Sequence, residues 1–189
     1  MFVKKVLLGL LVCVLFAGAV LAAVSDSEFI SLCMFGSLQQ INDAIRNGAN
    51  VNARDVSGTV TPLSAAAGFN SDPGVITTLA NAGADINARD GLGNTALMLA
   101  VVNNPNPGVI GALVRAGANI NAQDELGTTP LMGAALNISN PEVMITTLLE
   151  LGADPRIRNN FGMIALDAAN MNEKLRNTEA LRRLEAASR

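Results

Sequence analysis

The residues that could carry out chemistry are few in this chain, and histidine is absent from all 189 positions. Without histidine, the usual imidazole base is missing for a serine or cysteine nucleophile. The common zinc sites likewise lose one of their usual ligands. We therefore expect a protein that is not an enzyme and that holds no metal or cofactor.

Two short patterns that could bind ions or nucleotides have simpler explanations. The stretch from Asp85 to Gly91 spaces its acids almost like a calcium loop, but the third acid falls one position late and no glutamate closes the loop. Asparagine and aspartate in tight turns explain the same residues. Gly91 and Gly93 lack the third glycine and the preceding strand of a nucleotide-binding fingerprint. We interpret this segment as the tip of a hairpin.

The N-terminus has the layout of a secretory signal peptide. Lys4 and Lys5 precede an apolar run from Val6 to Val24 that ends in small residues. We expect residues 1–22 to be the signal peptide, with cleavage after Ala22 and with Ala23 or Ala19 as the next choices. The alternative is an uncleaved membrane anchor, because the run reaches the length that spans a bilayer. The protein is thus predicted to be exported, either periplasmic or secreted, or else anchored by this segment.

Composition and charge limit the classes of molecule that the protein is expected to bind. Half of the chain is hydrophobic but only 3% is aromatic, so its apolar mass is aliphatic, which suits packed helices. Cleavage would remove two of thirteen basic residues and leave sixteen acidic ones, a net charge near −5. An acidic chain is a poor ligand for nucleic acid. We expect a protein partner, no nucleic acid, no membrane contact after cleavage, and a monomer.

The rest of the chain consists of sequence segments that repeat at a regular interval. Related segments that read Gly-Ala-Asx-Ile/Val-Asn-Ala, the last of them degenerate, begin at Gly48, Gly83, Gly117 and Gly152. A second marker keeps the same interval of 34 or 35 residues, at Thr61, Thr95, Thr129 and Ile164. A third marker, Asp/Asn-Pro, recurs at Asp72, Asn106 and Asn140. Three markers in register indicate a tandem repeat.

Each marker has a structural role. The threonines can cap the free amides of a first helix, and the proline after two of them suits its first turn. The Asp/Asn-Pro pairs do the same for a second helix. The glycines follow the second helix at the position that favours a left-handed backbone. Because one such unit cannot cover its own apolar face, neighbouring units must stack into a continuous core.

These motifs resemble the ankyrin repeat, a turn plus two helices with a Thr-Pro-Leu-His-x-Ala motif. The resemblance covers roughly residue 26 to the C-terminus and implies an all-α ankyrin-repeat solenoid of about five helix-turn-helix repeats with hairpin loops. The family's histidine is replaced by Ser64, Met98, Met132 and Asp167. Its loss removes a hydrogen bond between neighbouring loops and predicts more mobile hairpins. The resemblance also places Cys33 as a small buried residue rather than a reactive thiol.

The predicted ankyrin-repeat domain is residues 26–189. Its repeats are approximately 26–54, 55–89, 90–123, 124–158 and 159–189, the first and last acting as caps with polar outer faces. The first cap is predicted to hold helices at 28–34 and 38–46, with Ser37 capping the second.

The resemblance implies that a partner contacts the hairpin tips and the exposed side of the first helices. At the tips the predicted contacts are Arg54, Arg89, Leu92, Asn94, Gln123, Glu125, Leu126, Arg158 and Phe161. On the concave helix face they are Phe69, Met98, Asn103, Met132 and Asn137. Leu92, Leu126 and Phe161 occupy equivalent places and form either an exposed apolar ridge or packing for the next hairpin. Met98 and Met132 are either adaptable contacts or core fillers.

The sequence thus predicts a noncatalytic protein-binding scaffold that acts through its concave face and hairpin tips. The alternative is a regulator or immunity-type inhibitor of an exported enzyme or toxin.

Overall fold

The computed structural model describes residues 24–137 and 139–189, and the predicted signal peptide at 1–22 lies outside them. The described chain forms five helix pairs: α2 (Asp26–Phe35) with α3 (Leu38–Arg46), α4 (Pro62–Phe69) with α5 (Pro73–Asn81), α6 (Ala96–Asn103) with α7 (Pro107–Arg115), α8 (Pro130–Leu136) with α9 (Pro141–Glu150), and α10 (Ala165–Asn170) with α11 (Glu179–Ala187). A short 3-10 helix, η1 (Glu173–Leu175), joins the last two. The fold is an all-α repeat solenoid.

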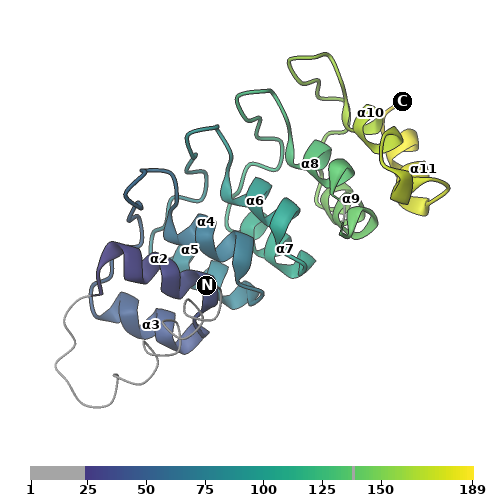
Figure 1. Ribbon diagram of the computed structural model, residues 1–189. Coiled ribbons are helices and arrows are strands. Elements are labelled where there is room, and N and C mark those ends of the chain that lie inside the picture. The colour runs from purple at the N-terminus through teal and green to yellow at the C-terminus, as the bar shows by residue number, and fades with distance from the viewer. Residues whose placement is uncertain (1–23, 138) are drawn as a thin grey trace, which may run out of the picture.

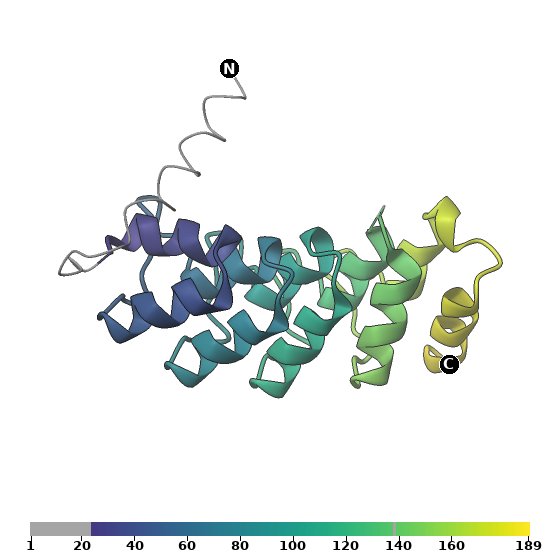
Figure 2. The ribbon, with the colours of Figure 1, turned by 90° about the horizontal axis from the view of Figure 1, so that it is seen from below.

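The helices form two parallel rows. The even-numbered helices α2 to α10 pack in sequence as the inner row, and α3, α5, α7, α9 and α11 pack as the outer row. Figure 1 shows long hairpins projecting to one side of these rows, and Figure 2 shows the two rows from below. None of the helices in the described residues is long and apolar enough for a membrane span.

Helix starts follow the local sequence. Thr61, Thr95 and Thr129 accept hydrogen bonds from the backbone amides three residues on, as predicted. Ser37 caps α3 as predicted, and α2 begins two residues earlier than predicted because Ser25 caps it with a reciprocal bond to Glu28. The Asp/Asn-Pro prediction is confirmed for α5 and α7 but is wrong for α9. Asn140 makes no side-chain cap, and its φ of −135° and ψ of 56° depart from the extended backbone of Asp72 and Asn106.

The glycine marker ends each of the first four outer helices. Gly48, Gly83, Gly117 and Gly152 have φ between 88° and 99°, the left-handed backbone that favours glycine, as the repeat pattern predicted.

The core runs the length of the solenoid between the rows. Its members recur once per repeat: Leu63, Leu97 and Leu131 from the inner helices, and Leu79, Leu113 and Leu148 from the outer ones. Small residues such as Ala66, Ala100 and Ala134 lie between them and are completely buried, which lets the rows approach closely.

An asparagine at the end of each inner helix from α4 to α10 ties it to the repeat before it. Asn104 Nδ2 donates to the carbonyls of Ala67 and Asn70 at 2.9 and 2.8 Å, and its Oδ1 accepts from the amide of Asn106 at 3.0 Å. The equivalent residues are Asn70, Asn137 and Asn172. This asparagine ladder satisfies carbonyls that helix ends would otherwise leave without partners.

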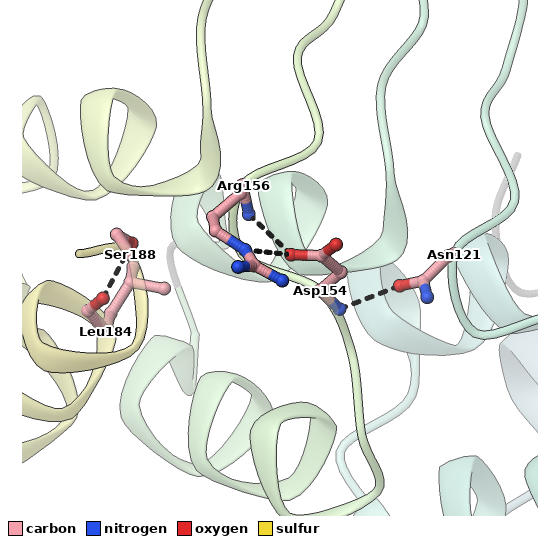
Figure 3. A network of polar contacts seen from close by, with 5 residues as sticks. All are labelled: Asn121, Asp154, Arg156, Leu184 and Ser188. Carbon is pink, nitrogen blue, oxygen red and sulfur yellow. Dashed lines mark hydrogen bonds and ion pairs between the residues drawn. The ribbon is translucent and has the colours of Figure 1, made fainter.

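A second row of asparagines joins the turns after the outer helices. Asn52, Asn87 and Asn121 accept hydrogen bonds from the backbone amides of Asp85, Asn119 and Asp154 in the next repeat. Figure 3 shows the last of these contacts, next to the bonds that Asp154 accepts from the amide and Nε of Arg156. The figure also shows Ser188 Oγ donating to the carbonyl of Leu184, where α11 ends. Each turn is therefore held by its own repeat and by the one before it.

Candidate functional site

The apolar ridge formed by Leu92, Leu126 and Phe161 is exposed. Their side chains are 66%, 56% and 71% accessible, so they do not fold back against the next hairpin, the alternative that the sequence left open. The structure thus places three large apolar side chains at equivalent hairpin tips, in contact with solvent.

Polar turns hold the ridge in this position. Asp124 Oδ1 accepts hydrogen bonds from the amides of Leu126 and Thr128, and Asp90 Oδ1 accepts from those of Leu92 and Asn94. Because an acceptor side chain satisfies the backbone at each tip, the apolar side chain beside it is free to point outward. Asn159 makes the equivalent two bonds to the amides of Phe161 and Met163.

Main-chain bonds also connect consecutive tips. The amide of Glu125 donates to the carbonyl of Leu92 at 3.1 Å, and the amide of Asn160 donates to the carbonyl of Leu126 at 3.0 Å. The ridge is therefore carried on backbone that is linked from one hairpin to the next.

A ladder of long polar side chains reinforces the hairpins. Arg89 Nη1 donates to the carbonyl of Gly93 in its own hairpin at 3.0 Å and to that of Gln123 in the next at 2.7 Å. Gln123 Nε2 repeats this with Gly127 and Arg158. Arg54 Nη1 reaches Gly58 and, at 3.4 Å, Arg89, while Arg158 Nη1 bonds Gly162 within its own hairpin. These predicted contact residues are exposed but also hold the hairpins. Their recurrence at the same place in four successive repeats is the sequence signal that could have indicated this role.

Three of the predicted contacts are not accessible. Met98, Met132 and Asn137 are 6%, 3% and 7% exposed, so the prediction that they lie open on the concave face is wrong, although Met98 contributes to the lining of a hollow between α6 and α8. Of the two roles considered for the methionines, core filling is the one observed, because each is enclosed where inner helices stack. Asn137 belongs to the asparagine ladder, with Nδ2 donating to the carbonyls of Val101 and Val102.

The remaining predicted contacts lie at the surface to different degrees. Phe69 is 55% exposed, and its ring lies 6.5 Å from that of Phe35 between centroids. Asn103 and Glu125 are exposed. Asn94 is half-buried, with its amide nitrogen donating to Asp90.

Sequence reasoning missed a second set of exposed apolar side chains at the ends of the inner helices. They are Phe35, Val102, Leu136 and Met171. All of them except Val102 come directly before the first glycine or asparagine after the inner helix, as Phe69 also does. An alignment of the repeats could have revealed this recurrence. The concave side therefore has apolar residues along this border as well as along the ridge.

Hydrogen bonds lower the pKa of two aspartates in the hairpins. Hydrogen bonds from Ser57 and from the amides of Val60 and Thr59 lower the pKa of Asp55 to about 2. Burial raises the pKa of Asp90, but bonds from the side chain and amide of Asn94 and from the amide of Leu92 outweigh it, so the net pKa is lowered. These carboxylates act as fixed acceptors and not as proton-transfer groups near neutral pH.

The part of the chain that the structure describes shows neither a candidate metal site nor a reactive thiol. Within residues 24–137 and 139–189, no group of three or more cysteine, aspartate or glutamate side chains is placed to hold a metal ion. Cys33 is a buried free thiol, and burial raises its pKa to about 12, which makes a thiolate nucleophile unfavourable.

Comparison with protein families identifies the repeat. A model of ankyrin repeats in three copies matches residues 29–124, and a model of the single ankyrin repeat matches residues 126–160. A comparison with curated proteins finds no significant match. The family matches cover the first four helix pairs, and the chain therefore belongs to the ankyrin-repeat family.

Proposed function

We propose that this protein is a noncatalytic scaffold that binds another protein through its hairpin tips and concave face. Ankyrin repeats are generally protein-interaction scaffolds, and repeat solenoids use extended concave surfaces for binding. The observation that carries the proposal is the apolar ridge, whose three side chains are each more than half exposed. Rows of exposed apolar residues on soluble domains mark interaction sites.

The composition of the inner helices also favours partner binding on the concave face. α4, α6 and α8 contain no charged residue, so the wall behind the ridge is uncharged over three consecutive repeats. Interface centres are depleted of charge and enriched in aromatic residues and methionine, while their rims are polar. The polar tip residues Asn94, Gln123 and Glu125 would supply such a rim.

Affinity capture tests the proposal. The purified protein and a variant with Leu92→Ser, Leu126→Ser and Phe161→Ser would be incubated with extracts of the source cell, and bound proteins identified by mass spectrometry. We expect one stoichiometric partner with the native protein and a reduced yield with the variant, with unchanged helical circular dichroism. Equal capture by both proteins would remove the ridge from the binding surface, and no enrichment by the native protein would argue against the scaffold role.

An inhibitory role is the alternative that capture can resolve. If the captured protein is an enzyme or toxin, its activity would be titrated with the scaffold. Complete loss at one equivalent would identify an inhibitor, whereas unchanged activity in a stable complex would identify a scaffold.

Export is part of the proposal and rests on the signal-peptide layout of residues 1–22. Intact-mass analysis of the protein from its source cell tests it. A mature chain that begins at or near Ala23 supports export with cleavage, and a full-length chain in the membrane fraction supports anchoring. A full-length chain in the cytosol would refute both.

A further inference from the structure

A hollow of about 290 Å³ opens on the concave face between α6 and α8. Met98, Leu99 and Val102 line it from α6, and Pro130 and Gly133 line it from α8. Asn103 and Asp124 contribute polar groups. The hollow thus lies between the second and third of the uncharged inner helices, below the hairpins that carry the apolar ridge.

The lack of a side chain at Gly133 contributes to this hollow. The preceding inner helix has Leu99 at the same distance from its capping threonine. A Cβ added at Gly133 would meet only Val102 Cγ2, at 3.9 Å, which is an ordinary van der Waals contact. Gly133 is not among the residues with positive φ, so its backbone does not require glycine. Its missing side chain leaves space that a larger residue would fill.

The size and lining of the hollow limit what can enter. Pockets for drug-sized ligands occupy about 300–1,000 Å³, so this one suits a single large side chain rather than a whole cofactor. α6 and α8 have no charged residue. A group that enters between these two helices is apolar, because neither helix offers a partner to a buried charge.

Asp124 gives the edge of the hollow a negative charge. Its Oδ1 accepts two backbone amides, but its Oδ2 accepts no hydrogen bond from the described residues. In the two preceding hairpins the second oxygen is satisfied by Ser57 and by Asn94. A cation or N–H donor on the ligand can therefore approach Asp124 without displacing a structural bond.

The residues around Asp124 strengthen this preference. Gln123 stands where the two preceding hairpins have arginine, and Glu125 follows. Arg89, the cation tied to this hairpin, directs Nη1 to the carbonyls of Gly93 and Gln123. The hairpin that borders the hollow thus has two acidic side chains and no basic one of its own.

We propose that this hollow is an anchor pocket for one leucine, methionine or phenylalanine side chain of a polypeptide partner, and that Asp124 pairs with a lysine or arginine of the same segment. The inference rests on the proposed function and names the chemistry of the partner. Since Asp124 lines the pocket itself, the basic residue lies one or two positions from the anchor in an extended segment, at about 3.3 Å per residue.

A peptide-display selection on the purified full chain tests this directly. The probes are short random peptides, and the affinity of each enriched peptide is then measured for the native protein and three variants. We expect enriched peptides to share a large apolar residue with a lysine or arginine one or two positions away. Gly133→Leu, which fills the pocket, should weaken them about 10- to 200-fold.

Two further variants separate the pocket from folding and from the rest of the concave face. Gly68→Leu is the control, because its added Cβ meets no atom within 4 Å and it lies on α4, outside the lining of the hollow. Gly68 is buried, but the equivalent positions of the next two inner helices hold Val102 and Leu136, so a large side chain is accommodated there. The Gly68→Leu protein should bind the peptides as the native protein does. Asp124→Asn keeps the Oδ1 acceptor, as Asn159 does naturally in the next hairpin, and should weaken the peptides and flatten their salt dependence. Urea midpoints of all variants should be no lower than that of the native protein.

Failure of the anchor pocket can be distinguished from failure of the proposed function. Equal affinity for the native and Gly133→Leu proteins, equal losses in Gly133→Leu and Gly68→Leu, or no enriched peptide would overturn the anchor pocket, while partner capture by the ridge would still stand. Enriched peptides without a basic residue, or no effect of Asp124→Asn, would overturn the role of Asp124.

Discussion

Replacing Asn104 by alanine should measure what the asparagine ladder contributes to stability. The Asn104 side chain is only 3% exposed and makes three hydrogen bonds, two of them to carbonyls of the preceding repeat. Alanine cannot replace any of these bonds. The carbonyls of Ala67 and Asn70 and the amide of Asn106 would lose their partners at the junction of two repeats.

The expected loss follows from the number of bonds. A typical intramolecular hydrogen bond contributes about 0.5–1.5 kcal/mol net, so three bonds contribute about 1.5–4.5 kcal/mol. The upper half of this range is expected, because buried groups left without partners cost more than exposed ones.

Urea denaturation followed by far-ultraviolet circular dichroism measures the loss. The matched control is Asn103→Ala, because Asn103 precedes Asn104 in the chain, is exposed and makes no side-chain hydrogen bond in the described structure. Its free energy of unfolding should change by no more than about 0.5 kcal/mol. If Asn104→Ala behaved like this control, with the same midpoint and slope, the ladder would not hold neighbouring repeats together.

Leu113 is completely buried in α7, and Leu113→Ala should cost about 2–5 kcal/mol in urea melts, so a loss near zero would refute the stacking of the outer row on the core. The Cys33 thiol, whose burial raises its pKa to about 12, should resist a maleimide at neutral pH and react fully once urea unfolds the chain; rapid labelling of the native protein would contradict its burial. The pKa of Asp55 is about 2 in the folded state, below its usual value of 3.8, so its contribution to stability is present above about pH 4 and is lost as the pH falls towards about 2. Asp55→Asn should therefore lose less stability between about pH 6 and about pH 3 than the native protein does, and an equal loss would exclude this carboxylate as a source of acid sensitivity.

Much of the fold could be predicted because its signals are local. Capping threonines, first-turn prolines and left-handed glycines act within a few residues, and their recurrence set the repeat length and the helix order. The failure at Asn140 has a physical reason that the local pattern does not contain. Asn140 lies three residues after the ladder residue Asn137, whereas the residues that cap α5 and α7 lie only two residues after their ladder asparagines. Its backbone, with φ −135° and ψ 56°, also departs from the extended conformation of those two caps.

The candidate site was harder to predict because burial depends on neighbouring repeats. Met98 and Met132 were predicted as contacts because the resemblance implies that partners bind the exposed side of the first helices, but stacking of the inner helices encloses them. The hollow beside Gly133 could be suspected only by comparing this glycine with its counterpart in the preceding repeat, Leu99. A glycine within a helix does not by itself indicate a pocket. The ridge was predicted as a set of equivalent positions, and only the structure settled that it is exposed.

The central claim is that a protein partner binds the hairpin tips and concave face. Hydrogen-exchange mass spectrometry of the complex with the captured partner, compared with the protein alone, tests it most directly. We predict slower exchange in the hairpins at residues 89–94, 123–128 and 158–163 and in α6 and α8, with no change in the outer helices α5, α7 and α9. Protection confined to the outer helices, with unchanged exchange in the hairpins, would contradict the account.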